Sequence, residues 1–189
     1  TPAPVRTTIF MAQGYVSPGA GGRIFENSCP PSRRGYHHGM IRVLVVCLGN
    51  ICRSPTAEAV LRAKAGAQGI DVAVDSAGTG AWHIGDPPYG PAISEGRARG
   101  YDLTPLRARK FIADDFARFD LILGMDDNNL SDIETLRPAD NATPVRLMTS
   151  FAEGLPAAVP DPYYTGDFSG AFDLIEQAAD AILSDIALR

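Results

Sequence analysis

Apolar residues run without a break from position 43 to position 47, where the sequence reads Val-Leu-Val-Val-Cys. A short and mostly β-branched run of this kind is typical of a central parallel strand that is covered on both faces. Together with the two residues before it, the run predicts a strand over residues 41–47. Similar segments predict three further strands, at residues 69–78, 119–124 and 144–148.

Helical patterns alternate with these strands. The clearest one lies near the end of the chain, where apolar residues recur at intervals of three or four and would form one helical face: Phe172, Ile175, Ala179, Ile182 and Ile186. Another begins after Ser54 and Pro55, which we expect to be the N-cap and the first turn of a helix. Two shorter helices are predicted at residues 91–100 and 126–136.

The alternation of strands and helices predicts an α/β fold. We expect a three-layer, doubly wound sheet of four parallel strands with helices on both faces and right-handed crossovers. Ligands of such sheets bind beyond the carboxyl ends of the strands. Cys47 stands at the carboxyl end of the first predicted strand, so the loop that follows it is the expected ligand-binding loop.

Residues 1–39 differ in composition from the rest of the chain. They contain 11 glycine and proline residues and show neither apolar period, which is typical of disordered chain. Their net charge is +3, from four Arg and one Glu. The whole chain has a net charge of −5, so the other residues together carry −8. We therefore predict a disordered or non-native extension over residues 1–39 and one domain over residues 40–189.

Charge and composition exclude several classes of protein. A net charge of −5 argues against nucleic-acid binding, and no apolar run is long enough for a transmembrane helix. The start of the chain has no sustained apolar segment, so we expect no signal peptide. Three cysteines fit a reducing cytoplasm. The histidines lack metal-ligand spacing, so we expect neither metal nor cofactor: His37, His38 and His83.

The segment from Cys47 to Ser54 has the pattern Cys-x5-Arg-Ser. A loop that leads into a helix exposes consecutive backbone N–H groups, which can surround an anion at the positive end of the helix. Gly49 permits a tight turn and Asn50 tolerates a left-handed backbone. Arg53 can hold phosphate oxygens through two parallel donors. The same surroundings stabilise a thiolate, which makes Cys47 a candidate nucleophile.

Two other interpretations of Cys47 are open from these residues alone. It can be a buried apolar residue, since free cysteines are often buried, or a redox partner of Cys52. A nucleotide-binding Walker loop is excluded, because the Gly-Lys-[Ser/Thr] ending is absent.

The stretch VCLGNICRSPTAEAV, residues 46–60, resembles the signature of the low-molecular-weight protein tyrosine phosphatases. The resemblance continues through residues 75–88, 108–130 and 161–175, in the family's order, and spans residues 41–188. It implies hydrolysis of phosphotyrosine through a phosphocysteine on Cys47, with Asp161 as general acid and base. Around Arg53, it implies a phosphate-binding loop formed by Leu48, Gly49, Asn50, Ile51, Cys52 and Ser54.

The resemblance also suggests the walls and the support of the site. Trp82, Tyr163 and Tyr164 resemble the aromatic residues that line the family's cleft, while His83 follows at a variable position. Ile51 favours phosphotyrosine, because related phosphatases that act on phosphoarginine tend to carry a polar threonine there.

Three residues around the loop resemble, or depart from, the family's supporting groups. Ser76 resembles the serine that supports the loop asparagine, and Asp126 resembles an acidic residue near the cleft, although a helix N-cap at Asp126 or Asp127 explains it equally well. Many relatives carry histidine at the place of Leu106. This departure puts the rigidity of the loop in doubt rather than its chemistry.

Several alternatives share the fold or the loop. Arsenate reductases relay oxidation through a downstream cysteine pair, but no cysteine follows Cys52. A phosphoarginine phosphatase, a phosphocysteine carrier and a catalytically dead phosphotyrosine-binding module are the others. Intact Cys47, Arg53 and Asp161 favour the tyrosine phosphatase. Its expected partner is a phosphotyrosine-containing protein, with a tyrosine kinase as the candidate that bacterial relatives suggest, and we expect a cytoplasmic monomer.

Overall fold

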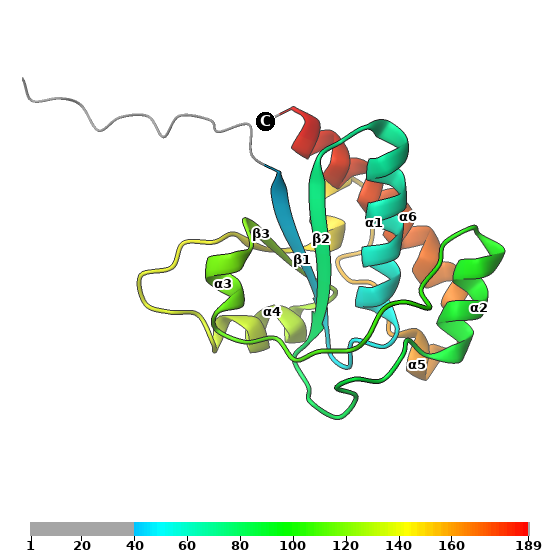
Figure 1. Ribbon diagram of the computed structural model, residues 1–189, viewed down its shortest axis with the longest axis horizontal. Helices are drawn as coiled ribbons and strands as arrows, with labels where there is room; N and C mark the ends of the chain where they lie inside the picture. Colours follow the sequence, from blue (N-terminus) through cyan, green and yellow to red (C-terminus); the bar gives the residue numbers. More distant parts are fainter. Residues whose placement is uncertain (1–39, 189) are drawn as a thin grey trace, which may run out of the picture. The chain divides into compact units, whose positions relative to one another are not determined.

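The computed structural model describes residues 40–188. The predicted extension over residues 1–39 lies outside the described residues, so it stays a prediction. The sheet has four parallel strands in the order β2-β1-β3-β4. Their bounds are Ile41–Cys47 for β1, Val72–Gly78 for β2, Leu121–Gly124 for β3 and Val145–Leu147 for β4. The predicted α/β fold with four parallel strands is confirmed (Figure 1).

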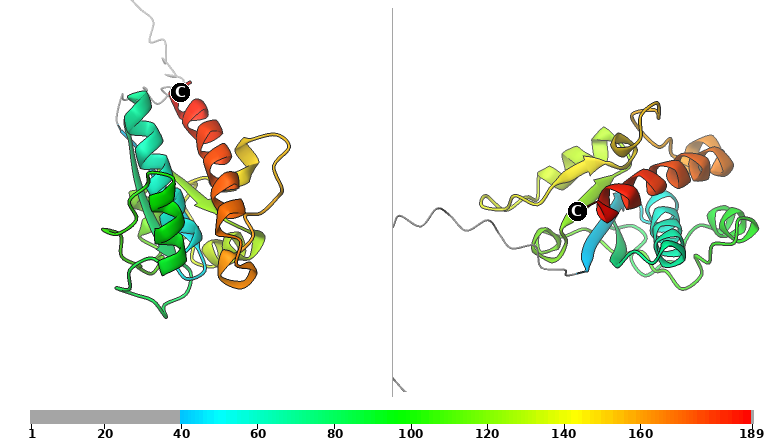
Figure 2. Two further views of the ribbon diagram at one scale, coloured as in Figure 1. Left: turned by 90° about the vertical axis from the view of Figure 1, so that its right-hand side faces the viewer. Right: turned by 90° about the horizontal axis from the view of Figure 1, so that it is seen from above.

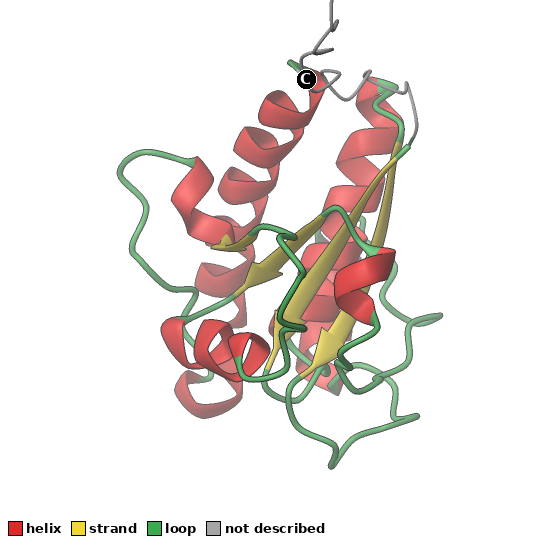
Figure 3. Ribbon diagram, turned by 90° about the vertical axis from the view of Figure 1, so that its left-hand side faces the viewer, coloured by secondary structure: helices red, strands yellow, loops and turns green. Residues whose placement is uncertain are grey.

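Helices cover both faces of the sheet, as predicted. On one face lie α1 (Arg53–Gln68), α2 (Gly90–Ala98) and the long α6 (Phe168–Ala187), and Figure 2 shows α1 and α6 side by side. On the other lie the short α3 (Asp115–Arg118) and α4 (Asp127–Glu134), seen in front of the sheet in Figure 3. A 3-10 turn, η1 (Met148–Phe151), and the one-turn α5 (Pro162–Thr165) complete the domain.

The alternation of side chains along β1 builds two cores. Val43 and Val45 pack with α1 and α6 in the larger core. Leu44 and Val46 point the other way, toward Phe111, Phe116 and neighbouring residues of α3 and α4. Because both faces of β1 are buried, the strand has the uninterrupted apolar run that identified it in the sequence.

The predicted start of α1 is wrong in detail. The helix begins at Arg53, and Cys52 occupies the N-cap position without a side-chain hydrogen bond. Ser54 lies inside the first turn, and its hydroxyl contacts Cys47 and Asn50 instead of capping the helix. The strand predicted over residues 69–78 begins later, because Gly69 adopts a left-handed conformation that ends α1.

The carboxyl ends of the strands gather four loops at one edge of the sheet. Cys47 pairs with Gly78 at the end of β2, and Val46 pairs with Gly124 at the end of β3. The amide of Val159 donates to the carbonyl of Met125 at 2.9 Å and brings in the segment before α5. Among the described residues, no helix combines the length and the apolar character needed to cross a membrane.

The buried face of α6 should dominate the stability of the domain. Replacing Ile175, which is fully buried in the larger core, with alanine is expected to lower the free energy of unfolding by about 2–5 kcal/mol. Gln177 lies on the exposed side of the same helix, so Gln177→Ala should change it by less than about 0.5 kcal/mol. Urea unfolding followed by circular dichroism measures both, and equal losses would contradict this assignment of faces.

Candidate active site

The sulfur of Cys47 lies at the bottom of a loop formed by residues 47–53. The residue is only 3% exposed. The backbone amide of Asn50 donates to its sulfur at 3.3 Å, and the hydroxyl of Ser54 lies 3.1 Å from the same atom. Hydrogen-bond donors of this kind stabilise a thiolate more than a neutral thiol.

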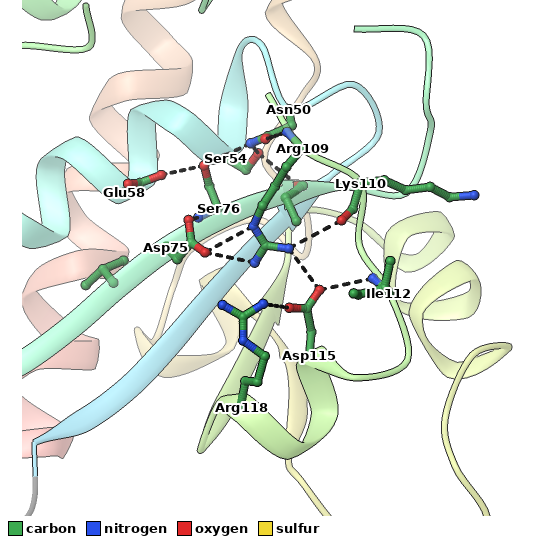
Figure 4. Close-up of polar contacts among 12 residues, drawn as sticks. Asn50, Ser54, Glu58, Asp75, Ser76, Arg109, Lys110, Ile112, Asp115 and Arg118 are labelled. Carbon is green, nitrogen blue, oxygen red and sulfur yellow. Dashed lines mark hydrogen bonds and ion pairs between the residues drawn. The ribbon is translucent and has the colours of Figure 1, made fainter. Parts of the chain in front are cut away.

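Asn50 holds the loop in its turn. Its φ of 54° is the only positive value for a non-glycine residue in the described chain. The side-chain amide donates to the hydroxyl oxygens of Ser54 and Ser76, both at 2.9 Å, and its Oδ1 accepts from the backbone amide of Arg109 at 2.9 Å. These three bonds, drawn in Figure 4, offset the strain of the left-handed backbone.

The absence of histidine at position 106 leaves this network complete. Leu106 is half-buried and packs against the larger core. The side-chain polar atoms of Asn50, Ser54 and Ser76 all have partners without it. The doubt that Leu106 raised about loop support is therefore answered by the contacts of Arg109 and Ser76.

Arg53 is almost fully buried beside the sulfur. Its Nη1 donates to Oδ2 of Asp126 at 2.6 Å and to the carbonyl of Val159 at 3.2 Å, while its Nη2 donates to Oδ2 of Asp161 at 2.7 Å. Burial opposes the charge, but Cys47 and the two carboxylates outweigh it and raise the pKa of Arg53. Its Nε is buried and has no hydrogen-bond partner among the described residues.

Asp126 and Asp161 each perform two structural tasks. Oδ1 of Asp126 accepts from the amide of Asn129 at 2.8 Å and caps α4, which agrees with the N-cap interpretation of this residue. Oδ1 of Asp161 accepts from the amide of Tyr163 at 3.1 Å and caps α5. In both residues the second oxygen remains for Arg53.

A pocket of about 300 Å³ opens above the loop. It brings together most of the residues predicted for the site, and its walls are Cys47, Leu48, Gly49, Ile51, Cys52, Arg53, Trp82, His83, Asp161, Tyr163 and Tyr164. Four other predicted residues do not line it: Asn50 and Ser76 lie behind the loop, Ser54 lies beside the sulfur, and Asp126 lies behind Arg53.

The aromatic walls differ in how they are held. Trp82 is 74% exposed, and its ring lies so close to Gly80 that an added Cβ there would stand 2.0 Å from it. The ring of Tyr163 contacts those of Tyr89 and Tyr164 at centroid distances of 5.5 and 5.4 Å. The tyrosine wall is therefore braced by neighbouring rings, whereas Trp82 depends on the space that Gly80 leaves.

The two described cysteines are free thiols in different surroundings. Burial, with a further contribution from Cys47, raises the pKa of Cys52 to about 12. Cys52 is therefore a neutral thiol at physiological pH. Cys47, by contrast, receives a backbone N–H and lies next to a hydroxyl and a guanidinium.

Sequence reasoning missed several groups of the site. His83, which the sequence places only at a variable position after Trp82, lines the pocket, and its Nδ1 lies 3.0 Å from Oδ2 of Asp86. The backbone groups of Val159 and Arg109 leave no signal in the sequence at all. The buried carboxylate of Glu58, which accepts from Ser76, could have been found from its place among buried residues of α1.

Comparisons with known sequences agree on one family. The family model described as low molecular weight phosphotyrosine protein phosphatase matches residues 42–188. The low molecular weight protein-tyrosine-phosphatase YfkJ of Bacillus subtilis is 39% identical over 150 residues, which cover 78% of this chain and 96% of YfkJ. The low molecular weight phosphotyrosine protein phosphatase of Schizosaccharomyces pombe is 44% identical over 130 residues, covering 67% and 83%.

Solved structures give the same result. The crystal structure of YfkJ superposes with a TM-score of 0.76 at 38% identity, over 79% of this chain and 96% of that one. The Drosophila arginine phosphatase superposes with a TM-score of 0.72 at 30% identity, over 77% and 97%. The chain with this loop and pocket therefore belongs to the low molecular weight phosphotyrosine protein phosphatases, a family of hydrolases.

Proposed function

We propose that this protein hydrolyses phosphotyrosine in proteins through a phosphocysteine on Cys47, with Asp161 as general acid and base. The observation that carries the proposal is the convergence of three groups on one pocket. The sulfur of Cys47, the guanidinium of Arg53 and the carboxylate of Asp161 all line it, and Arg53 bonds Asp161 directly.

In the first step, the thiolate of Cys47 attacks phosphorus. A phosphorus–sulfur bond forms while the bond to the tyrosyl oxygen breaks, and the leaving oxygen takes the proton of Asp161. The amides of the loop and the guanidinium of Arg53 hold the other phosphate oxygens. On binding, before this step, the phosphate of the substrate replaces Asp161 as a partner of Arg53, which frees the carboxyl group for proton transfer.

In the second step, water attacks the phosphocysteine. The carboxylate of Asp161 accepts a proton from this water, the phosphorus–sulfur bond breaks, and the thiolate of Cys47 is restored with release of inorganic phosphate. One carboxyl group serves both steps, because giving its proton to the leaving oxygen in the first step leaves it as the carboxylate that accepts a proton from water in the second.

The walls of the pocket favour an aromatic substrate. Trp82, Tyr163 and Ile51 all line it, and such aromatic and apolar walls suit the flat ring of phosphotyrosine. The Drosophila neighbour is an arginine phosphatase, but apolar Ile51 favours phosphotyrosine over phosphoarginine here. We propose that the substrate is a phosphotyrosine-containing protein, such as a tyrosine kinase. We also propose that the enzyme is a monomer in the cytoplasm, a compartment in which its free thiols stay reduced.

Replacing the proposed nucleophile tests the function directly. The wild-type protein should hydrolyse p-nitrophenyl phosphate and a phosphotyrosyl peptide at mildly acidic pH, and Cys47→Ser should reduce turnover to background, because a serine hydroxyl has no activating base here. Phosphate release measures both. Cys29→Ser, a matched substitution outside the residues that match the family model, should retain activity. Turnover that persists in Cys47→Ser would refute the proposed mechanism.

Replacing the proposed acid separates chemistry from binding. Asp161→Ala should lower kcat for a phosphotyrosyl peptide by about 10²- to 10⁴-fold, and the loss should shrink for aryl phosphates whose phenols are more acidic, since these leave without a proton. Steady-state kinetics over a series of phenols measures this. Asp127→Ala is the control, because Asp127 is an exposed carboxylate of α4. An equal loss for every leaving group would contradict the acid role.

The space at Gly80 provides a test of the aromatic wall. Gly80→Ala should push Trp82 aside and raise KM for a phosphotyrosyl peptide by about three- to tenfold with little change in kcat. Trp82 is the only tryptophan of the chain, so its fluorescence reports the displacement. Gly90→Ala adds a methyl group with nothing within 4 Å and should change neither. A change in the fluorescence of Trp82 with an unchanged KM would show that Trp82 is not part of the binding site.

A further inference from the structure

A buried carboxylate lies behind the phosphate loop, on the side away from the pocket. Glu58 is 3% exposed. Its Oε2 accepts from the hydroxyl of Ser76 at 2.5 Å, and its Oε1 forms an ion pair with Nη2 of Arg62 at 2.7 Å. Figure 4 shows Glu58 at one end of a chain of polar contacts that runs through Ser76 to Asn50.

The charge of Glu58 fixes which atoms donate along this chain. Ser76 has a single hydroxyl hydrogen, and an ionised carboxylate can only accept it. The oxygen of Ser76 is then left to accept from the side-chain amide of Asn50 at 2.9 Å. This places Oδ1 of Asn50 toward Arg109, whose backbone amide is a donor. Every partner of Asn50 therefore agrees with one orientation of its amide.

This series of hydrogen bonds ends at the sulfur of Cys47. Ser54 accepts from the amide of Asn50, so its own hydrogen remains available to Cys47 at 3.1 Å or to the carbonyl of Ala77 at 3.3 Å. The backbone amide of Asn50 donates to the same sulfur. Both donors to Cys47 therefore depend on how Asn50 is held.

We propose that ionised Glu58 is a positioning residue that sets the direction of the hydrogen-bond chain Glu58–Ser76–Asn50–Ser54, so that two donors face the sulfur of Cys47. The inference rests on the proposed function, since it gives Glu58 a role only if Cys47 reacts as a thiolate.

The surroundings of Glu58 show what holds its charge. Burial raises its pKa, and Asp75 of β2 adds to the shift, whereas the hydroxyl of Ser76 and the cations Arg62 and Arg109 oppose it. A raised pKa means that ionising Glu58 costs more in the folded protein than in the unfolded chain, so this charge does not stabilise the fold. The charge of Glu58 therefore orients the loop but does not add to the free energy of unfolding. This difference separates a positioning role from a structural one.

Glu58→Gln keeps the shape of the side chain but reverses the direction of the hydrogen bonds in the series Glu58–Ser76–Asn50–Ser54. Arg62 favours one orientation of the new amide, because its Nη2, which also donates to the carbonyl of Val74 at 2.7 Å, would meet a second donor if the amide nitrogen faced it. The amide nitrogen then faces Ser76 and donates to it, in competition with Asn50. Adding Arg62→Met removes this constraint and lets the glutamine turn its oxygen back to Ser76, so the double variant should recover what the single variant loses.

The experiment measures kcat/KM for a phosphotyrosyl peptide and the pH dependence of Cys47 alkylation by iodoacetate. Glu58→Gln should lower kcat/KM about tenfold and move the alkylation profile to higher pH, without loss of stability in urea. Glu58→Gln with Arg62→Met should regain at least about a third of the wild-type kcat/KM. Glu176→Gln is the matched control, because Glu176 also accepts one hydroxyl, of Tyr101, and pairs with one guanidinium, of Arg99.

The possible outcomes are distinct. A Glu58→Gln profile that overlays the wild type, or a double variant no better than Glu58→Gln, overturns the inference. If Glu58→Gln does not fold, Ser76→Ala breaks the same chain one step further along and must move the profile to higher pH; an unmoved profile overturns the inference again. If the wild type does not hydrolyse the peptide, the proposed function fails, while the alkylation profiles still decide the role of Glu58.

Discussion

The buried positive charge of Arg53 is the constraint on which the rest of the site depends. A guanidinium removed from water must be paired, and its partners come from parts of the chain far from α1: Asp126 follows β3, and Val159 and Asp161 precede α5. The loops at the carboxyl edge of the sheet therefore converge on one side chain. The convergence also leaves Arg53 with a partner, Asp161, that an incoming phosphate can replace.

The two carboxylates of Arg53 are fixed by the helices that they cap. Because Asp126 and Asp161 each use one oxygen for a helix amide, only the other oxygen turns toward Arg53. Asp161 is less constrained than it would be inside a regular element, since α5 is a single turn that begins at Pro162. The proposed proton donor is thus placed on a short, locally capped segment rather than in the core.

The sequence predicted the fold and the residues that line the pocket better than the contacts that support the loop from behind. The apolar runs of β1 and α6 face cores on their buried sides, so their patterns are strong, and the spacing from Cys47 to Arg53 is local. The one-turn helices α3 and α5 are too short for a periodic pattern. Ser54 was assigned to a cap because capping preferences are local, whereas its contact with Cys47 depends on the turn at Asn50. Contacts of backbone atoms, such as the amide of Arg109, leave no trace in side-chain identity.

The side of the loop that faces the pocket and the side that faces Glu58 differ in their electrostatics. On the side of the pocket, the proposed mechanism has Arg53 and the loop amides bind and release a phosphate anion, and Asp161 is the partner of Arg53 that this anion would replace. Behind the loop, three hydrogen bonds of the Asn50 side chain hold this residue in its left-handed backbone conformation. Burying the charge of Glu58 costs stability, but a neutral acceptor in its place could donate as well as accept. An ionised carboxylate leaves Ser76, and through it Asn50, only one arrangement.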